Sequence, residues 1–405
     1  MRGRNDTANQ SWSTIVSSQK YGYREAMRST DARVFLVWSA LAVGACNKPD
    51  TTPTTGNSVQ PAAPPAPEPP PPPRPPHVYT AAEADALLLQ WDMGKVKIPD
   101  DNPQSTPKIE LGHQLFFDKR LSADGSRSCY SCHQNEDGTG GHEPLGVGAN
   151  KKPLTRHAPS LWNVGFLPRL NWDGRSHSLE TQALDALEGD QMGLGEGKVP
   201  AKAAEIAKIL GYKRLFEAAF PGEPISVDTL VQAISSYERT LVCNDSAFDK
   251  FGKGDKSAMS DEQKRGFMIF SERAKCDTCH TPPFFSDTYL PPTGAFFNIG
   301  IGTENKEDKD VDPGRMRVTK KESDWGAFKP PSLRNVSNTP PYFHDGSRPT
   351  LEAAVRFMAG GGHDNKNHSP IVQDKKLSDE EVHLIVTFLG SLACEEKLVP
   401  PKKLP

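Results

Sequence analysis

The chain has 405 residues, 37 of them proline, and a formal net charge of −3 at pH 7. Its length corresponds to about two domains, and its many prolines indicate that part of it is not globular. Because 48 basic residues are balanced by 51 acidic ones, the composition argues against a protein that binds nucleic acid. The sequence also lacks an apolar run of about 18 residues, so no ordinary membrane-spanning helix is expected.

The N-terminal region has the features of an export signal. Residues 34–45 are almost entirely apolar and follow Arg28 and Arg33. A run of this length matches the hydrophobic region of a secretory signal peptide and is too short to cross a membrane. We therefore expect residues 1–45 to be a signal region, with translation starting at Met27, and the mature protein to face the periplasm.

Cys46 directly follows this region, in the sequence Val-Gly-Ala-Cys. This sequence resembles a bacterial lipobox, in which the cysteine is lipidated and becomes the mature N-terminus. The alternative is an ordinary secretory signal with an incidental cysteine. A run of prolines at 69–73 favours an extended segment without packed structure. Residues 46–79 are thus predicted to be a lipid-anchored linker that holds the rest of the chain near a membrane.

Beyond this linker, the spacing of apolar residues predicts a helical region. Helices are expected over residues 80–91, 107–117, 227–242 and 379–392. Ser260 with Gln263, and Ser378 with Glu381, have the spacing of capping boxes that open helices. Strand signals are sparse, and the connections are long and irregular. The predicted fold class is therefore mainly α, and such long loops need an organising group.

The motif Cys-x-x-Cys-His occurs twice, at residues 129–133 and 276–280. It is the attachment motif of c-type haem. On a helical turn, two cysteines three residues apart can reach the two haem vinyl groups, and the adjacent histidine can bind the iron. A zinc site would need both cysteine pairs around one ion, and thioredoxin-like chemistry would need a βαβ context, so both alternatives are less favoured. The predicted haem-binding residues are Cys129, Cys132, His133, Cys276, Cys279 and His280.

The two motifs also indicate an internal repeat. Gly112 and Gly266 each precede a run of apolar residues shortly before a motif. The simplest architecture is two cytochrome-c-like domains, residues 80–245 and 246–405, each built around one covalently attached haem.

Several longer segments resemble one known family. Residues 115–122, 172–175, 332–336 and 341–346 are similar, in the same order, to segments of the bacterial di-haem cytochrome c peroxidase/MauG family. The resemblance covers residues 107–395. It implies a peroxidatic first haem and an electron-transfer second haem.

The resemblance also implies roles for individual residues. His133 and His280 would be the proximal iron ligands. Met358 would be the distal ligand of the second haem, where MauG-type enzymes have Tyr; a thioether raises the reduction potential. The alternative is that Met358 is a core residue of an amphipathic helix. Trp172 would lie between the haems as an electron relay, and Gln182 in the distal pocket of the first.

The first haem lacks one ligand that relatives carry. Ala149 stands at the position of a distal His, so the first haem is expected to be open to peroxide. His142 is the nearest substitute ligand, and the alternative is a loop His without a contact to iron.

The distal acid–base group differs as well. Gln191 stands where the family has a catalytic Glu, and an amide cannot shuttle a proton as a carboxyl does. Asp190 or Glu188 would serve instead if the local register differs. Ala186 replaces a distal-pocket Pro.

A calcium ion lies between the haems of relatives. The backbone carbonyls of Thr339 and Pro341 match two of its donors, but His157 replaces an Asn and is a poor ligand for a hard cation. Cys243 and Cys394 remain, and an oxidising compartment favours a disulfide between them over two separate thiols.

Three functions compete. The favoured one is reduction of hydrogen peroxide with electrons from a small cytochrome c or a cupredoxin. The second is a MauG-like oxidase that acts on a partner protein, and the third is a tethered di-haem electron carrier without enzymatic activity. The carrier would need both irons six-coordinate, so ligation of the first haem separates it from the enzymes. Relatives are often dimers, so a homodimer is among the expected states.

Overall fold

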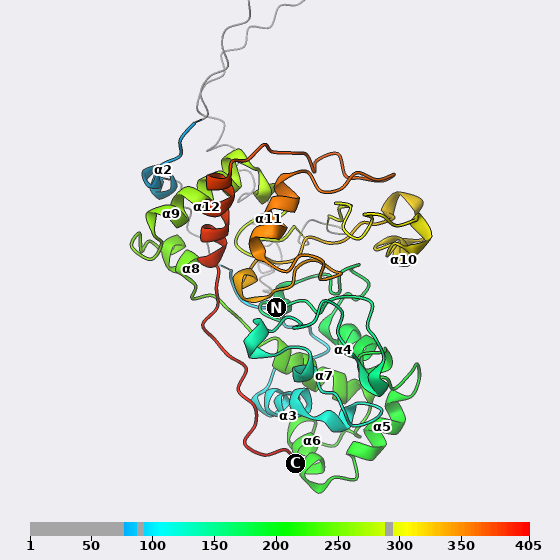
Figure 1. Cartoon of the computed structure of the whole chain (residues 1–405). Coiled ribbons are helices and arrows are strands. Elements are labelled where there is room, and N and C mark those ends of the chain that lie inside the picture. The colour runs from blue at the N-terminus through cyan, green and yellow to red at the C-terminus, as the bar shows by residue number, and fades with distance from the viewer. Residues whose placement is uncertain (1–76, 87–92, 288–294) are drawn as a thin grey trace, which may run out of the picture. The chain divides into compact units, whose positions relative to one another are not determined.

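The computed structural model describes residues 77–86, 93–287 and 295–405 (Figure 1). The signal, the lipid anchor and most of the linker therefore lie outside the described residues. In the described ranges the regular structure is helical, accompanied by isolated β-bridges, which confirms the mainly α prediction. None of these helices is long and apolar enough to cross a membrane. The helices are α2 Ala81–Ala86, α3 Thr106–Phe117, α4 Leu179–Glu188, α5 Val199–Ile206, α6 Leu210–Ala219, α7 Val227–Glu238, α8 Ala247–Gly252, α9 Asp261–Met268, α10 Met316–Thr319, α11 Leu351–Ala359 and α12 Asp379–Gly390.

Most predicted helix boundaries agree with the structure. Helix α3 begins one residue earlier than expected, and α12 ends two residues earlier, at Gly390. The capping boxes at Ser260 and Ser378 both form. The prediction of a helix up to residue 242 is wrong by one turn. Helix α7 ends at Glu238, because from Thr240 to Val242 the amides bond to carbonyls only two or three residues back.

Two helix pairs form the framework around the Cys-x-x-Cys-His motifs. Helix α3 crosses α7, and a Cβ atom on Gly112 would lie only 1.9 Å from the carbonyl oxygen of Ala233. Helix α9 crosses α12 in the same way, and a Cβ on Gly266 would lie 2.0 Å from the carbonyl oxygen of Leu384. The repeated glycine therefore has a physical cause, since each allows two helix backbones to touch.

We expect Gly266→Ala to lower the free energy of unfolding by about 1–3 kcal/mol, the usual cost of forcing an extra methyl group into a packed site. The clash is with backbone, which cannot rotate away. Chemical denaturation of this variant beside Gly390→Ala measures the effect. Gly390 lies in the partner helix with no atom near its Cβ position, so its substitution is expected to be neutral or slightly stabilising. Equal losses in both variants would contradict the crossing argument.

A second feature is repeated after each of these helix pairs: an asparagine side chain accepts a hydrogen bond from a backbone amide of the following segment. Asn163 and Asn335 both have a positive φ, of 65° and 62°. The Asn163 side-chain oxygen accepts the amide of Cys243 at 2.8 Å, and that of Asn335 accepts the amide of Cys394 at 2.9 Å. The two cysteines form a disulfide, as expected for an oxidising compartment. The disulfide thus covalently joins equivalent points of the two halves of the chain, the first of which carries the motif at 129–133 and the second the motif at 276–280.

The segment after α12 returns to the first half of the chain. In Figure 1 it is red and runs from α12 to the neighbourhood of α3 and α6. His113 in α3 contacts the carbonyl oxygen of Val399 at 2.6 Å. Leu398 is buried and belongs to a cluster with Phe116 and Tyr237. The C-terminal segment is therefore part of the packing around the first motif.

Candidate functional site

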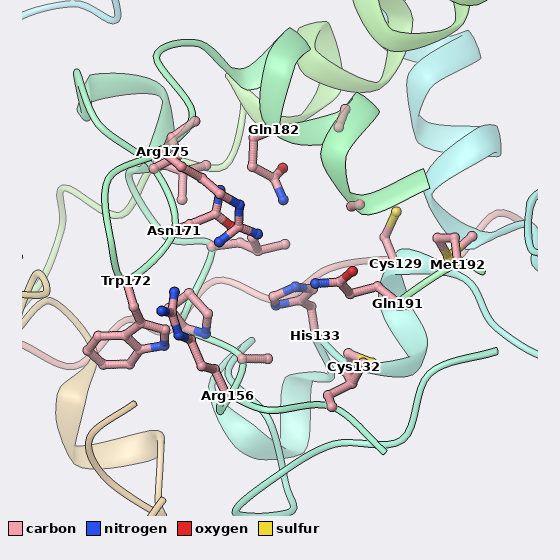
Figure 2. Close-up of a pocket in the computed structure, with 18 of the residues that line it drawn as sticks. Cys129, Cys132, His133, Arg156, Asn171, Trp172, Arg175, Gln182, Gln191 and Met192 are labelled. Carbon is pink, nitrogen blue, oxygen red and sulfur yellow. The ribbon is translucent and has the colours of Figure 1, made fainter. Parts of the chain in front are cut away.

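The first Cys-x-x-Cys-His motif begins with a 3-10 turn, Cys129–Ser131. A reciprocal pair of hydrogen bonds between Ser128 and Ser131 caps the start of this turn. The amides of Cys132 and His133 both bond to the carbonyl of Cys129, which winds the five residues into one turn. Figure 2 shows Cys129, Cys132 and His133 around one cavity, as the spacing predicts. The second motif repeats this turn at Cys276–Thr278.

Both motif histidines are oriented by a backbone carbonyl. Nδ1 of His133 donates to Thr139 O at 2.8 Å, and Nδ1 of His280 donates to Phe285 O at 3.0 Å. In each ring Nε2 is then the atom that can bind a metal. Burial lowers the pKa of both imidazoles, so they remain neutral, the form that coordinates iron.

The motif thiols do not have the properties of redox-active thiolates. Burial raises the pKa of Cys276 and Cys279 to about 12 and raises that of Cys129 and Cys132 as well. Thioredoxin-like chemistry requires a lowered thiol pKa, so that alternative is disfavoured. The two motifs also line different cavities, so their cysteine pairs do not meet around one zinc ion.

The first cavity has a volume of about 560 Å³ and is large enough for a planar macrocycle. His133 and the two motif cysteines form one part of its wall. Helix α4 and the turn that follows it form another, with Gln182, Ala186, Asp190 and Gln191. In Figure 2 the Gln182 amide points from α4 into the cavity. This wall offers hydrogen-bonding groups.

The second cavity is smaller, at about 230 Å³, and its lining is mostly apolar. Cys276, Cys279 and His280 line it, and Met358 on α11 lines it as well. The structure thus brings Met358 and His280 to one cavity, the arrangement needed for two ligands of one iron. The first cavity therefore suits a c-type haem by size, and both cavities suit it by paired thiols and by an oriented neutral imidazole.

The two cavity walls are built by equivalent segments. A β-bridge between Leu170 and Ser176 precedes α4, and a bridge between Tyr342 and Arg348 precedes α11. The N-cap residues of the two helices, Ser178 and Thr350, each lie four residues after an equivalent glycine, Gly174 and Gly346.

Counting eight residues on from each N-cap reaches Ala186 in α4 and Met358 in α11. The second cavity therefore has a thioether where the first has a methyl group. This substitution is the difference between the two walls that bears directly on iron ligation.

Trp172 lines both cavities. Its indole N–H donates to His157 O at 2.8 Å, and its ring meets His344 edge-on with centroids 6.3 Å apart. The structure therefore places Trp172 between the two sites, where the resemblance requires it.

Three other distal candidates lie elsewhere. The Ala149 amide bonds to Gln191 O at 3.0 Å, and its methyl group cannot bind a metal. His142 is not part of the cavity lining: its side chain is 74% exposed and contacts Asp137 at 3.0 Å. Glu188 accepts the Gly197 amide at 2.8 Å and does not line the cavity either. Asp190 is thus the carboxyl, among the replacements considered for the missing Glu, that the structure brings to the cavity.

The residues expected around calcium do not fit that ion. His157 is 5% exposed, its Nδ1 donates to Glu143 O at 3.0 Å, and burial lowers its pKa. The Thr339 hydroxyl donates to Val336 O. A neutral imidazole and a few backbone carbonyls lack the carboxylates that calcium prefers. We therefore derive no role for calcium.

Sequence reasoning missed two ionisable residues at the first cavity. Glu238 lines it, burial raises its pKa to about 8, and its Oε2 atom has no hydrogen-bond partner. Arg156 also lines it and forms 2.6 Å ion pairs with Asp173 and Asp312. A signal for Glu238 was present, because it lies four residues after Ile234 on the predicted apolar face of its helix.

Comparisons with known proteins agree with this geometry. The family model for "Di-haem cytochrome c peroxidase" matches residues 106–257. The cytochrome-c peroxidase IdrP1 of Pseudomonas sp. strain SCT is 33% identical over 341 residues, which are 79% of this chain and 89% of that protein. The methylamine utilization protein MauG of Methylorubrum extorquens is 33% identical over 337 residues, 80% of this chain and 92% of that one. A crystal structure of a MauG-like protein associated with microbial copper homeostasis has a TM-score of 0.69 at 30% identity and covers 76% of this chain and 95% of its own.

Proposed function

The chain belongs to the family of di-haem cytochrome c peroxidases and MauG-like enzymes, which are oxidoreductases, and on this basis we propose that it reduces hydrogen peroxide to water with electrons from a small redox protein. The observation that carries the proposal is the difference between the two cavities. One has Met358 on the wall where the other has only Ala186. A site with two ligands suits electron transfer, and a site with a free side suits a small substrate.

Each Cys-x-x-Cys-His motif would hold one haem c. Cys129, Cys132 and His133 would bind the first, and the equivalent residues 276, 279 and 280 the second, with Met358 as its additional ligand. When bound, the haems supply one-electron redox chemistry. Reduction of one hydrogen peroxide to two waters consumes two electrons and two protons, so two one-electron sites in one chain match the reaction. Trp172, between the sites, is the aromatic side chain suited to relay electrons.

The remaining residues of the first cavity position the substrate and its protons. Gln182 and Gln191 offer amide groups that donate and accept hydrogen bonds without changing charge. The exposed carboxyl of Asp190 can take a proton from water and give it up within the cavity. Asp190 would therefore act in place of the missing Glu.

The proposal extends to the location of the protein. A periplasmic lipoprotein, anchored through Cys46 and spaced by the proline-rich linker, would meet small cytochromes c or cupredoxins near the membrane. Covalent haem attachment outside the cytoplasm and the Cys243–Cys394 disulfide both suit an oxidising compartment.

A MauG-like oxidase acting on a partner protein is the second candidate. Its support is the 33% identity to MauG and the structural similarity to a MauG-like protein. Met358 argues against this second function, because MauG-type enzymes, by the resemblance, have Tyr at this position.

The test is to mix the haem-loaded ferric protein with hydrogen peroxide and a reduced small cytochrome c and to follow donor oxidation by absorbance. We expect rapid turnover without prior reduction, because the first cavity lacks a second ligand. Activity only after reduction would mean that a ligand must first leave. Absence of turnover in either state, with slow oxidation of protein side chains, would favour the MauG-like reading.

A further inference from the structure

The loop after His133, residues 134–139, is clamped to the C-terminal segment. Asn135 Nδ2 donates to Leu398 O at 2.8 Å, and the Leu398 amide donates to Asn135 Oδ1 at 2.8 Å. The Asn135 side chain thus donates one hydrogen bond to the Leu398 backbone and accepts one from it, as the backbone of a neighbouring β-strand would. The two residues are 263 positions apart in the sequence, and Leu398 is only 3% exposed. Such a paired contact between distant segments fixes the loop relative to the C-terminal segment.

The clamped loop carries the carbonyl that orients His133. The Thr139 amide bonds back to Gln134 O at 2.7 Å, and Thr139 O accepts the His133 Nδ1–H. Thr139 has φ 66°, a conformation that side chains with a branched Cβ rarely adopt. Contacts must therefore hold it, among them the 2.9 Å bond between the Thr139 and Ser160 hydroxyls. A shift of Asn135 would be passed to this carbonyl within four residues.

The C-terminal segment is itself fixed on both sides of Leu398. At its start, Cys394 is bonded to Cys243, and its amide donates to Asn335 Oδ1. Just after Leu398, the Val399 carbonyl contacts His113 in α3. Residues 394–399, which we call the strap, are therefore a rigid support for the loop.

We propose that the strap positions His133, through Asn135 and the Thr139 carbonyl, and thereby sets the reduction potential of the first haem. Asn135 is a positioning residue and does not touch the haem site itself. The hydrogen bond to Nδ1 raises the basicity of a ligating imidazole, so a weaker bond raises the reduction potential of the iron. The inference rests on the proposed haem at His133 and is independent of the peroxidase activity.

The second half provides an internal reference. His280 is oriented by Phe285 O, in a loop that bonds to Ser332 and Arg334 of its own half. Loss of the bonds between Asn135 and Leu398 should therefore affect the first haem alone.

The experiment is redox titration of the full haem-loaded chain by absorbance, with each haem also followed by electron paramagnetic resonance. For Asn135→Ala we expect the first haem's reduction equilibrium to shift toward the reduced form by at least about threefold, or about 30 mV at 59 mV per tenfold. The second haem should not change. Asn367→Ala is the matched control, because Asn367 also donates to a backbone carbonyl, that of Glu322, but contacts neither motif loop.

A second variant keeps the test decisive if Asn135→Ala folds poorly. A chain ending at Lys397 removes the other partner of the clamp and should give the same shift. Their effects on the first haem's potential should be non-additive when combined, because both remove the Asn135–Leu398 bonds. An unchanged first haem, or equal shifts of both haems in variants that retain two haems per chain, would overturn the role of the strap. Fewer than two haems in the unmodified chain would instead overturn the proposed haem sites.

Discussion

Replacing Ala186 with Met is expected to reduce peroxide-dependent donor oxidation by about a hundredfold. The equivalent position of the second half carries Met358, and both lie eight residues after a helix N-cap. A thioether at position 186 would then reach the first cavity as Met358 reaches the second. If it occupies the distal side for about 99% of the time, the fraction of sites able to bind peroxide falls to about 1%.

Ala186→Leu is the matched control, because leucine fills a similar volume but cannot bind iron. We expect the Met variant alone to show the absorption and paramagnetic resonance signals of a six-coordinate, low-spin first haem. Equal loss of activity in both variants would attribute the effect to crowding, and an unaltered Met variant would contradict the equivalence of α4 and α11.

Replacing Met358 with Leu is expected to lower the reduction potential of the second haem. Loss of a thioether ligand should shift it by on the order of 0.1 V, a fraction of the about 0.8 V range that axial ligands span. The rate of donor oxidation should also fall, because a one-electron donor reduces a haem of lower potential less readily.

The control for this variant is Met268→Leu. Met268 is buried in the core of the second half but does not line the cavity. A packing role for Met358 would give similar small losses of stability in both variants and an unchanged potential, and that outcome would remove Met358 from the site.

The parts of this protein that the sequence predicts are those set by short-range geometry. The two Cys-x-x-Cys-His turns, the capping boxes at Ser260 and Ser378 and the periodic face of α12 each depend on residues within one or a few helical turns. The repeat was also visible, since Gly112 and Gly266 precede the two motifs. Their role at helix crossings was not, because it depends on which helix lies opposite.

What could not be predicted depends on contacts between distant residues. The end of α7 at Glu238 follows from the sharp turn toward Cys243, and the clamp between Asn135 and Leu398 has no local signal. The distal wall was predicted from the resemblance alone, and the equivalence of Ala186 and Met358 needed the two helices. One usable signal was overlooked: residues 160–164 and 332–336 share the pattern Ser-Leu-x-Asn-Val, which contains both asparagines that hold the cysteines.

The disulfide also determines what happens when the chain is cut. Cys243 and Cys394 are 151 residues apart in the sequence, so the bond and the intervening backbone form a closed covalent ring around the second motif. A protease that hydrolyses one peptide bond in this ring opens it but releases no fragment. Such a nicked protein migrates as one piece on a denaturing gel until a thiol reductant is added, and then separates into two. A single cut in a surface loop of the second half would therefore leave both motifs in one molecule.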